Sequence, residues 1–261
     1  MKNMKSLLKK DCIEFLRTKR IAIYGGALGV LILMVLFTTF AFPRLLTLIN
    51  DVAPEIFADI TSLDEIVGGL VPKDLAGGFG LWSADVGMFI SMVVIFFSGT
   101  ILPSEIRNGR WVLPVNSGYK KNHIVLSKSL IYGIGAFVCV FVSTMVFYCI
   151  ASTFMERNMT FKEALFCTFC LSFAFFAVSV YSVLLSVLFK HCAIPIIILI
   201  VGTVATPDIL TFFEIGEYLP TYLYTIAYSA YADYSNMWIP LLLSVISMLL
   251  LFFAVKLKLR R

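Results

Sequence analysis

Long apolar runs, separated by short polar segments, constrain the fold of this chain more than any other feature of its sequence. A helix needs about 20 apolar residues to cross a bilayer. By this criterion we predict six membrane-spanning helices, at residues 21–42, 86–102, 130–150, 165–189, 193–210 and 238–255. The fifth run is the weakest, because Gly202 interrupts it and Pro207 ends it. With 60% hydrophobic and 14% charged residues, the chain is predicted to be a single all-α polytopic membrane domain.

The distribution of basic residues predicts the side of the membrane that each segment faces. Most of the 21 Lys and Arg residues lie in segment 1–20, in segment 103–129 and in the C-terminal tail. Basic residues next to spans favour the cytoplasm, so both termini and segment 103–129 are predicted to be cytoplasmic. In this topology Asp11, Glu14 and Glu105 are the only acidic residues on that side. The net charge of +5 therefore reports topology, and we expect no nucleic-acid partner.

Two segments next to the first span have amphipathic patterns. In residues 1–20 an apolar stripe runs among basic residues and consists of Met4, Leu8, Cys12 and Phe15, widened by Leu7 and Leu16. We predict an interfacial helix held by apolar burial and by lipid headgroups. The extracellular loop at 43–85 has helical spacing of apolar residues over 49–67, which predicts one or two amphipathic helices over the outer mouth. Its Gly77-Gly78-Phe79-Gly80 run predicts a flexible return into the second span.

The last extracellular segment, 207–237, is rich in tyrosine. Its tyrosines are Tyr218, Tyr222, Tyr224, Tyr228, Tyr231 and Tyr234, and Pro220 interrupts the run. Tyrosine favours the membrane–water boundary, where its ring is buried and its hydroxyl is hydrated. The pattern fits either a re-entrant helical hairpin packed against protein or an interfacial loop with an aromatic belt.

Few groups in this sequence could carry out chemistry. There is no G-x-x-x-x-G-K-[ST] phosphate loop, no H-E-x-x-H zinc motif and no G-x-S-x-G nucleophile elbow. Cys167 and Cys170 form a C-x-x-C pair, which in an apolar span is more typical of small packing residues than of a metal or redox site. We expect no catalytic residue, no metal site and no cofactor on this chain.

Four serines share one face of the predicted fourth span: Ser172, Ser179, Ser182 and Ser186. They would either line a translocation path or allow neighbouring helices to approach closely, and small residues in membranes more often do the second. No charged residue lies near the middle of a predicted span, which disfavours an ion-coupled carrier.

The segment between the second and third spans, SEIRNGRWVLPVNSGYKKNHIVLSK, mixes charged and apolar residues. We expect the second span to end at Pro103 and Ser104 to cap a short helix with Glu105 in its first turn. Gly109 then allows a turn, and Pro114 ends the helix.

This short helix displays Trp111-Val112-Leu113 beside Arg110, with Lys120 and Lys121 following it. A solvated connector has no need of an exposed apolar patch with a charged rim. The pattern therefore predicts a docking surface for a cytoplasmic protein.

The segment resembles the coupling helix of the type-2 ATP-binding-cassette (ABC) exporter permeases. These proteins have six spans, an interfacial N-terminal helix and a coupling helix that commonly reads Glu, a few residues, Gly-Thr, apolar residues, Pro and a basic residue, with a Lys before the third span. This chain matches at Glu105, Gly109, Leu113-Pro114, Lys120 or Lys121, and Lys128. It departs at Arg110, where Thr is frequent, and at Asn116-Ser117, where a Ser-Arg pair is common. Its start, LLKKDCIEFLRTKR, also resembles the first helix of the family.

The resemblance implies a permease subunit in the plasma membrane of a bacterium, working with a separate ABC-type ATPase that binds ATP and Mg²⁺. A second permease copy, or a related permease, would complete the pathway. The implied ATPase contacts are Glu105, Gly109, Arg110, Trp111, Pro114, Lys120 and Lys121. In size the chain resembles small bacterial peptide and bacteriocin exporters or immunity permeases, so we expect a hydrophobic or amphipathic cargo, best a peptide. The alternatives are an ion-coupled carrier or channel, and a non-transporting sensor or anchor subunit.

Overall fold

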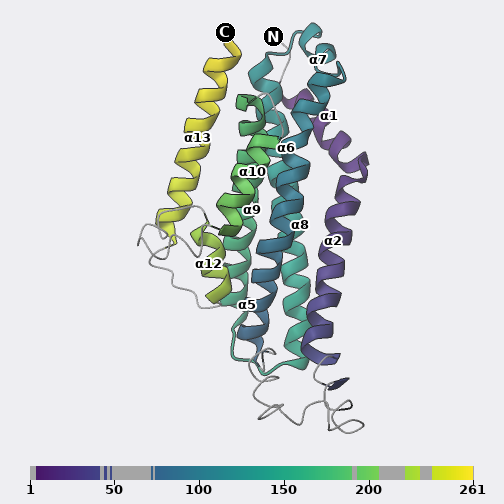
Figure 1. Ribbon diagram of the computed structural model, residues 1–261, viewed down its shortest axis with the longest axis vertical. Coiled ribbons are helices and arrows are strands. Elements are labelled where there is room, and N and C mark those ends of the chain that lie inside the picture. Colours follow the sequence, from purple (N-terminus) through teal and green to yellow (C-terminus); the bar gives the residue numbers. More distant parts are fainter. Residues whose placement is uncertain are drawn as a thin grey trace.

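The computed structural model describes residues 4–41, 44, 45, 48, 72, 74–189, 193–205, 221–229 and 237–260. Over these residues the protein is a bundle of helices without a β-strand (Figure 1). Five helices are long and apolar enough to cross a membrane. The prediction of an all-α, multi-pass membrane fold is therefore confirmed.

The helices follow one another along the chain with these bounds. The first are α1 (Met4–Arg17), α2 (Lys19–Leu36) and its π-helical continuation η1 (Phe37–Ala41). Next come α5 (Leu75–Asp85), the π-helical η3 (Val86–Ile90), α6 (Ser91–Arg107), α7 (Val112–Asn116) and α8 (Lys121–Phe154). The last are α9 (Phe161–Phe189), α10 (Ala193–Ile200), the π-helical η4 (Val201–Ala205), α12 (Tyr222–Ser229) and α13 (Trp238–Arg260). The predicted spans 130–150, 165–189 and 238–255 lie within α8, α9 and α13, and nearly all of 21–42 lies in α2 and η1.

The second membrane helix begins earlier than the sequence pattern suggested. α5, η3 and α6 form one continuous helix from Leu75 to Arg107, so the expected loop at 43–85 ends at least ten residues sooner. Asp74 caps this helix, since its carboxylate accepts a hydrogen bond from the Gly77 N–H at 3.1 Å. The Asn158 side chain accepts a second bond from the Ala76 N–H at 2.9 Å. These partners satisfy amide groups that would otherwise be unpaired at a helix start.

The glycines of this first turn serve close packing, and the expected flexible return is a rigid helix. A Cβ added at Gly78 would lie 2.7 Å from the sulfur of Met155, and one added at Gly80 would lie 2.7 Å from the carbonyl oxygen of Tyr228. At Gly80 a side chain would meet fixed backbone, whereas at Gly78 the Met155 side chain would have to move.

Pro103 does not end the second membrane helix as expected, because α6 continues through it to Arg107. Proline removes one backbone donor but leaves the following turn free to form. That turn is formed here, since the Asn108 N–H donates to the Ser104 carbonyl at 2.9 Å. Ser104 caps no new helix, and its hydroxyl donates to the Ile101 carbonyl at 2.7 Å.

The remaining predictions on the spans fall partly outside the described residues. The run at 193–210 is helical over α10 and η4, which together are shorter than the five long helices, so six spans stays a prediction. The amphipathic helices expected at 49–67 lie outside the described residues. Of segment 207–237 the structure describes only 221–229 and Met237, and α12 buries Leu223, Tyr224, Ile226 and Ala227.

α9 is the most deeply buried of the long helices, whereas α2 and α13 expose most of their apolar surface. The core beside α9 includes a stacked pair, Trp82 and Phe147, with ring centroids 4.9 Å apart. The Trp82 indole N–H donates to the Thr144 hydroxyl at 3.1 Å, which satisfies its only polar group. The outward apolar surface is what a bilayer requires of a spanning helix.

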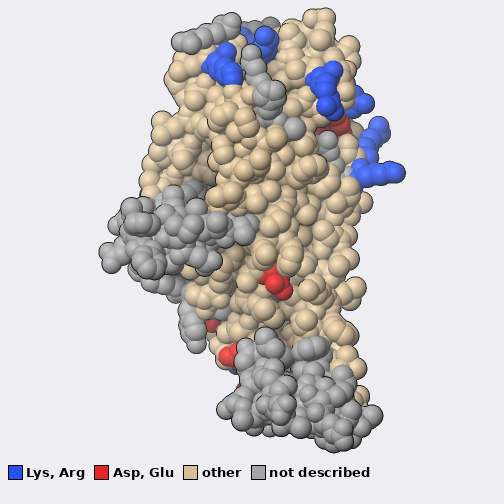
Figure 2. All heavy atoms as spheres, viewed as in Figure 1, with Lys and Arg blue, Asp and Glu red and all other residues tan. Residues whose placement is uncertain are grey.

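Figure 1 shows α1, α7 and the C-terminal end of α13 at one end of the bundle, which we call the α7 end. The start of α5 and the connection between α8 and α9 lie at the opposite end. In Figure 2 the Lys and Arg side chains of the visible face gather at the α7 end, whereas Asp and Glu lie mainly toward the other end. This polarity is that of the predicted topology, whose side assignment stays a prediction.

Candidate functional site

The candidate site is the segment that joins α6 to α8 at the α7 end, residues 106–121, which we call the docking segment. Two glycines shape it, because both adopt the left-handed backbone that other residues disfavour, with φ of 69° at Gly109 and 88° at Gly118. Gly109 turns the chain between α6 and α7, and the Val112 N–H donates to its carbonyl at 3.2 Å. The predicted turn at Gly109 is confirmed. Pro114 lies in the first turn of α7, where a proline is tolerated, and does not end a helix begun at Ser104.

The docking segment presents apolar side chains among cations. Ile106, Val112 and Leu113 are 52%, 51% and 72% exposed. The cations Arg107, Arg110, Lys120 and Lys121 are all exposed. Trp111 was expected to be displayed with Val112 and Leu113, but it is only partly exposed. It packs against a small apolar cluster that includes Leu102, Val125 and Val255. Trp111 therefore anchors the segment to the bundle, and Val112 and Leu113 form its outer surface.

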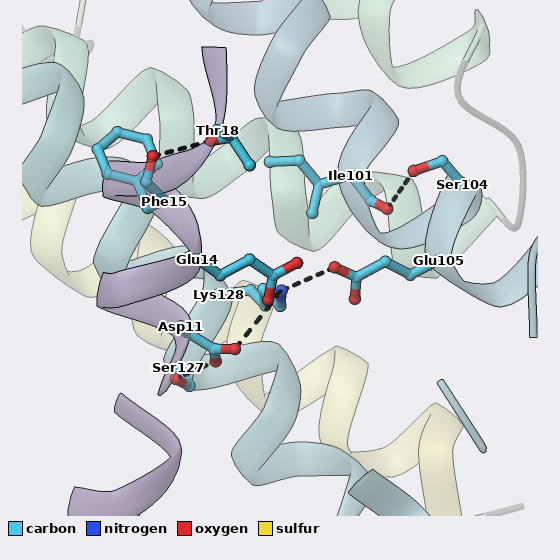
Figure 3. Close-up of polar contacts among 9 residues, drawn as sticks. All are labelled: Asp11, Glu14, Phe15, Thr18, Ile101, Ser104, Glu105, Ser127 and Lys128. Carbon is cyan, nitrogen blue, oxygen red and sulfur yellow. Dashed lines mark hydrogen bonds and ion pairs between the residues drawn. The ribbon is translucent and has the colours of Figure 1, made fainter. Parts of the chain in front are cut away.

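Directly behind the docking segment, one lysine is surrounded by three carboxylates (Figure 3). The Lys128 Nζ lies 2.7 Å from Glu105 at the end of α6 and 3.1 Å from Glu14 of α1. The third carboxylate is Asp11 of α1, at 3.5 Å. The Ser127 hydroxyl also donates to Asp11, at 2.5 Å. We call Asp11, Glu14, Glu105 and Lys128 the ion cluster, and it ties α1, α6 and α8 together.

The ion cluster is buried at one side and open at the other. The side chains of Lys128 and Asp11 are 6% and 2% exposed, whereas those of Glu105 and Glu14 are 16% and 37% exposed. A charge that loses its water must be compensated by partners, and Lys128 and Asp11 compensate each other here. The outer carboxylates keep contact with solvent, which makes three acids around one cation tolerable.

Glu105 was expected in the first turn of an exposed helix, but it lies in the last turn of α6 and points inward to Lys128. The contact with an ATPase that the resemblance implies for it stays a prediction. Because α6 does not stop at Pro103, Glu105 lies on the face of α6 that meets α8. Its geometry is that of a residue that positions the docking segment.

α1 buries only part of the predicted stripe. Leu7, Asp11 and Phe15 are buried, whereas Cys12 and Leu16 of the predicted stripe are exposed. The Phe15 ring packs edge-on against Tyr132 of α8, with centroids 4.9 Å apart. The buried face also includes Asp11, which the stripe did not contain, because Lys128 and Ser127 bind its carboxylate inside the protein.

The sequence contained one signal for the ion cluster. Asp11, Glu14 and Glu105 are the only acidic residues on the predicted cytoplasmic side, and all three contact the same lysine. Lys128 matched the family pattern without a role attached to it. Sequence spacing could not show that these residues meet, because they come from three separate helices.

The four serines of α9 are buried within the chain. Ser179 lies 2.8 Å from the Ser98 hydroxyl of α6, and the Ser182 hydroxyl donates to the Ile95 carbonyl at 2.7 Å. Ser172 and Ser186 donate to carbonyls of α9 itself, Thr168 and Val183. These contacts are those of helix packing, and a path lined by the four serines stays a prediction.

Cys167 and Cys170 also have packing partners. The Cys167 thiol lies 4.0 Å from the Ile226 carbonyl, and the Cys170 sulfur lies 3.4 Å from the sulfur of Met237. Over the described ranges, no group of three or more His, Cys, Asp and Glu side chains is arranged to hold a metal ion.

Comparisons with protein-family models, with curated proteins and with solved structures find no match to this chain. A functional proposal therefore depends on the residues and the geometry described above.

Proposed function

We propose that this chain is the membrane-spanning permease subunit of an ATP-driven exporter of the type-2 ABC class, on which a separate ATPase subunit docks. The observation that carries the proposal is the docking segment itself. It exposes Val112 and Leu113 among four cations, yet Trp111 and Glu105 fix it to the bundle. A surface that is both exposed and firmly held is suited to receive a partner and to transmit its movement.

The chemistry of the docking segment predicts the surface of the partner. Exposed Ile106, Val112 and Leu113 would enter an apolar cleft, since burial of such side chains stabilises an interface. Arg107, Arg110, Lys120 and Lys121 would face an acidic rim, because complementary charge steers association and selects partners. This surface would belong to the ATPase, which would bind ATP and Mg²⁺.

A movement of the docking segment would reach the far side of the bundle through one helix. Glu105 is part of the continuous helix Leu75–Arg107, whose 33 residues would extend about 50 Å at 1.5 Å per residue. Its other end is capped by Asp74 and held by hydrogen bonds to Asn158 in the α8–α9 connection. ATP-driven closure of the partner would thus shift a unit made of α5, α6, α8 and α9, and a second permease copy would complete the pathway.

The proposed cargo is a hydrophobic or amphipathic molecule, best a peptide, because the long helices are apolar and the size of the chain resembles that of small peptide exporters and immunity permeases. The location that follows is the plasma membrane of a bacterium. An ion-coupled carrier or channel and a sensor or anchor subunit are the rivals, and each predicts a different result in transport assays.

The experiment compares the chain with Leu113→Asp and with a matched control, Lys162→Asp, which changes an exposed residue near the opposite end. Gentle solubilisation should recover a stoichiometric ATPase with the wild type and the control, and at least tenfold less with Leu113→Asp. Inverted membrane vesicles should take up amphipathic peptide only when ATP is supplied.

Peptide or ion movement that needs no ATP and no partner would establish a carrier or channel instead. A bound partner without any transport would establish a sensor or anchor subunit.

A further inference from the structure

We propose that the outer face of α1 binds the headgroups of anionic phospholipids. Through the ion cluster, this binding also restrains the docking segment. The proposal concerns the chain in its membrane and does not depend on an ATPase partner.

The charges of α1 are sorted between its two faces. Both acidic residues of the helix, Asp11 and Glu14, turn toward Lys128. Exposed cations occupy the remaining surface: Lys5, Lys9, Lys10 and Arg17. The exposed face of α1 thus has cations without a fully exposed anion, although the sequence of the helix mixes both signs. A surface of this kind attracts anionic lipid and is indifferent to zwitterionic lipid.

Apolar side chains stand between these cations. Leu16 is 64% exposed and Ile13 is 41% exposed, and Cys12 is exposed beside them. Leucine and isoleucine among lysines form the pattern of a helix that lies at the boundary between headgroups and acyl chains.

The position of α1 decides between a lipid surface and an acidic protein as the occupant. Only Thr18 separates α1 from α2, which is long and apolar enough to cross the membrane. The C-terminal end of α1 therefore lies at the level where α2 enters the bilayer. At the membrane boundary, the anionic groups next to this helix are lipid headgroups.

The ion cluster links α1 to the docking segment. Lys128 contacts both acids of α1 and also Glu105, which directly precedes the docking segment (Figure 3). When α1 is held at the membrane, its two acids keep Lys128 in place, and Lys128 keeps Glu105 and the end of α6 in place. When α1 is loose, Lys128 loses two of its partners and the docking segment is less restrained.

Mass action gives the expected size of the effect. A ligand that binds only the docked arrangement of α1 stabilises that arrangement. Each basic residue near an anionic surface strengthens binding about fivefold. Removal of two of the exposed cations of α1 should therefore weaken lipid binding by about 25-fold.

The experiment measures backbone hydrogen exchange of the full chain in nanodiscs. The probes are phosphatidylcholine alone and a mixture of phosphatidylcholine with phosphatidylglycerol. In the wild type, residues 4–17 and residues 108–119 should both exchange more slowly in the anionic mixture. Lys9→Gln combined with Arg17→Gln should abolish this difference in both segments, because these side chains are exposed and their loss leaves the ion cluster intact. Arg157→Gln combined with Lys162→Gln, the matched control at the opposite end, should keep it.

Glu105→Gln tests the link separately from the lipid site. It leaves Asp11 and Glu14 on Lys128, so residues 4–17 should still respond to anionic lipid, while residues 108–119 should no longer follow. Equal exchange of residues 4–17 in both lipids would overturn the lipid site. A docking segment that still follows α1 in Glu105→Gln would overturn the link. Neither result bears on whether an ATPase binds, so this test and that of the exporter proposal fail independently.

Discussion

At the scale of single residues, Lys128 has the largest number of distant partners in the ion cluster. Its ammonium group meets carboxylates that are 117, 114 and 23 positions away in the chain, at Asp11, Glu14 and Glu105. Asp11 depends on this lysine most, because its side chain is 2% exposed and its partners among the described residues are Lys128 and Ser127. Loss of the lysine would leave a buried carboxylate next to two others, without the cation that offsets their repulsion.

Lys128→Met is therefore expected to destabilise the protein by about 3–5 kcal/mol, the range for breaking a buried ion pair from one side. Lys121→Met is the matched control, since Lys121 is exposed and outside the ion cluster, and it should change stability by less than about 0.5 kcal/mol. Denaturant titration of the purified chain in mild detergent measures both. Equal midpoints for the two variants would show that the ion cluster contributes nothing to the fold.

Residue identity alone predicted part of this site. Gly109 was assigned a turn because a glycine between a charged and an apolar stretch favours one, and its φ of 69° requires glycine. No partner was predicted for Asp11, which lies among the basic residues of the predicted interfacial helix. Its burial follows from a lysine more than a hundred residues later, and no local pattern carries that information.

At the scale of elements, apolar length predicted the helices well because lipid leaves a spanning segment no partner for its backbone except itself. The bounds were predicted less well where tertiary contacts decide them. Asp74 and Asn158 start the second long helix eleven residues before the predicted apolar run. α6 extends past Pro103 because the next turn closes normally. The hydropathy of the sequence predicts neither the earlier start of this helix nor its continuation past Pro103.

The contact between the second long helix and α12 depends on glycines, which leave room for Tyr228. A Cβ at Gly87 would overlap the hydroxyl of Tyr228, with the ring carbon Cζ at 3.1 Å. Gly80 meets the backbone of the same tyrosine. α12 can therefore lie against this helix only because glycines face it at both levels.

Gly87→Ala should destabilise the protein by about 1–3 kcal/mol through overpacking. In a Tyr228→Phe background the cost should fall, because the atom that the new methyl group overlaps is absent, and a double-mutant cycle measures the difference. Gly29→Ala is the control, since nothing lies within 4 Å of a Cβ at that position. Additive effects of the two substitutions would show that Gly87 and Tyr228 do not meet.

At the scale of the whole molecule, the directions of α9 and α13 determine how often the chain crosses the membrane. Met237, just before α13, contacts Cys170 early in α9, Tyr181 donates to the Ser244 carbonyl at 3.2 Å, and Lys258 donates to the Leu188 carbonyl. The two helices are therefore parallel. A chain that leaves α9 at the α7 end must return before α13 begins, and α10 with η4 provides about 20 Å of that path, less than the hydrocarbon core of about 30 Å.

This geometry predicts an even number of crossings, with both termini and the docking segment on one side of the membrane and the α8–α9 connection on the other. Reporters fused to either terminus, or inserted after Gly118, should behave as cytoplasmic. The same reporter inserted after Arg157 should behave as external, because basic residues concentrate at the α7 end and favour the cytoplasm. A C-terminal reporter on the side opposite to the N-terminal one would mean that the chain makes only the five long crossings. The parallel packing of α9 and α13 could not then hold in the membrane.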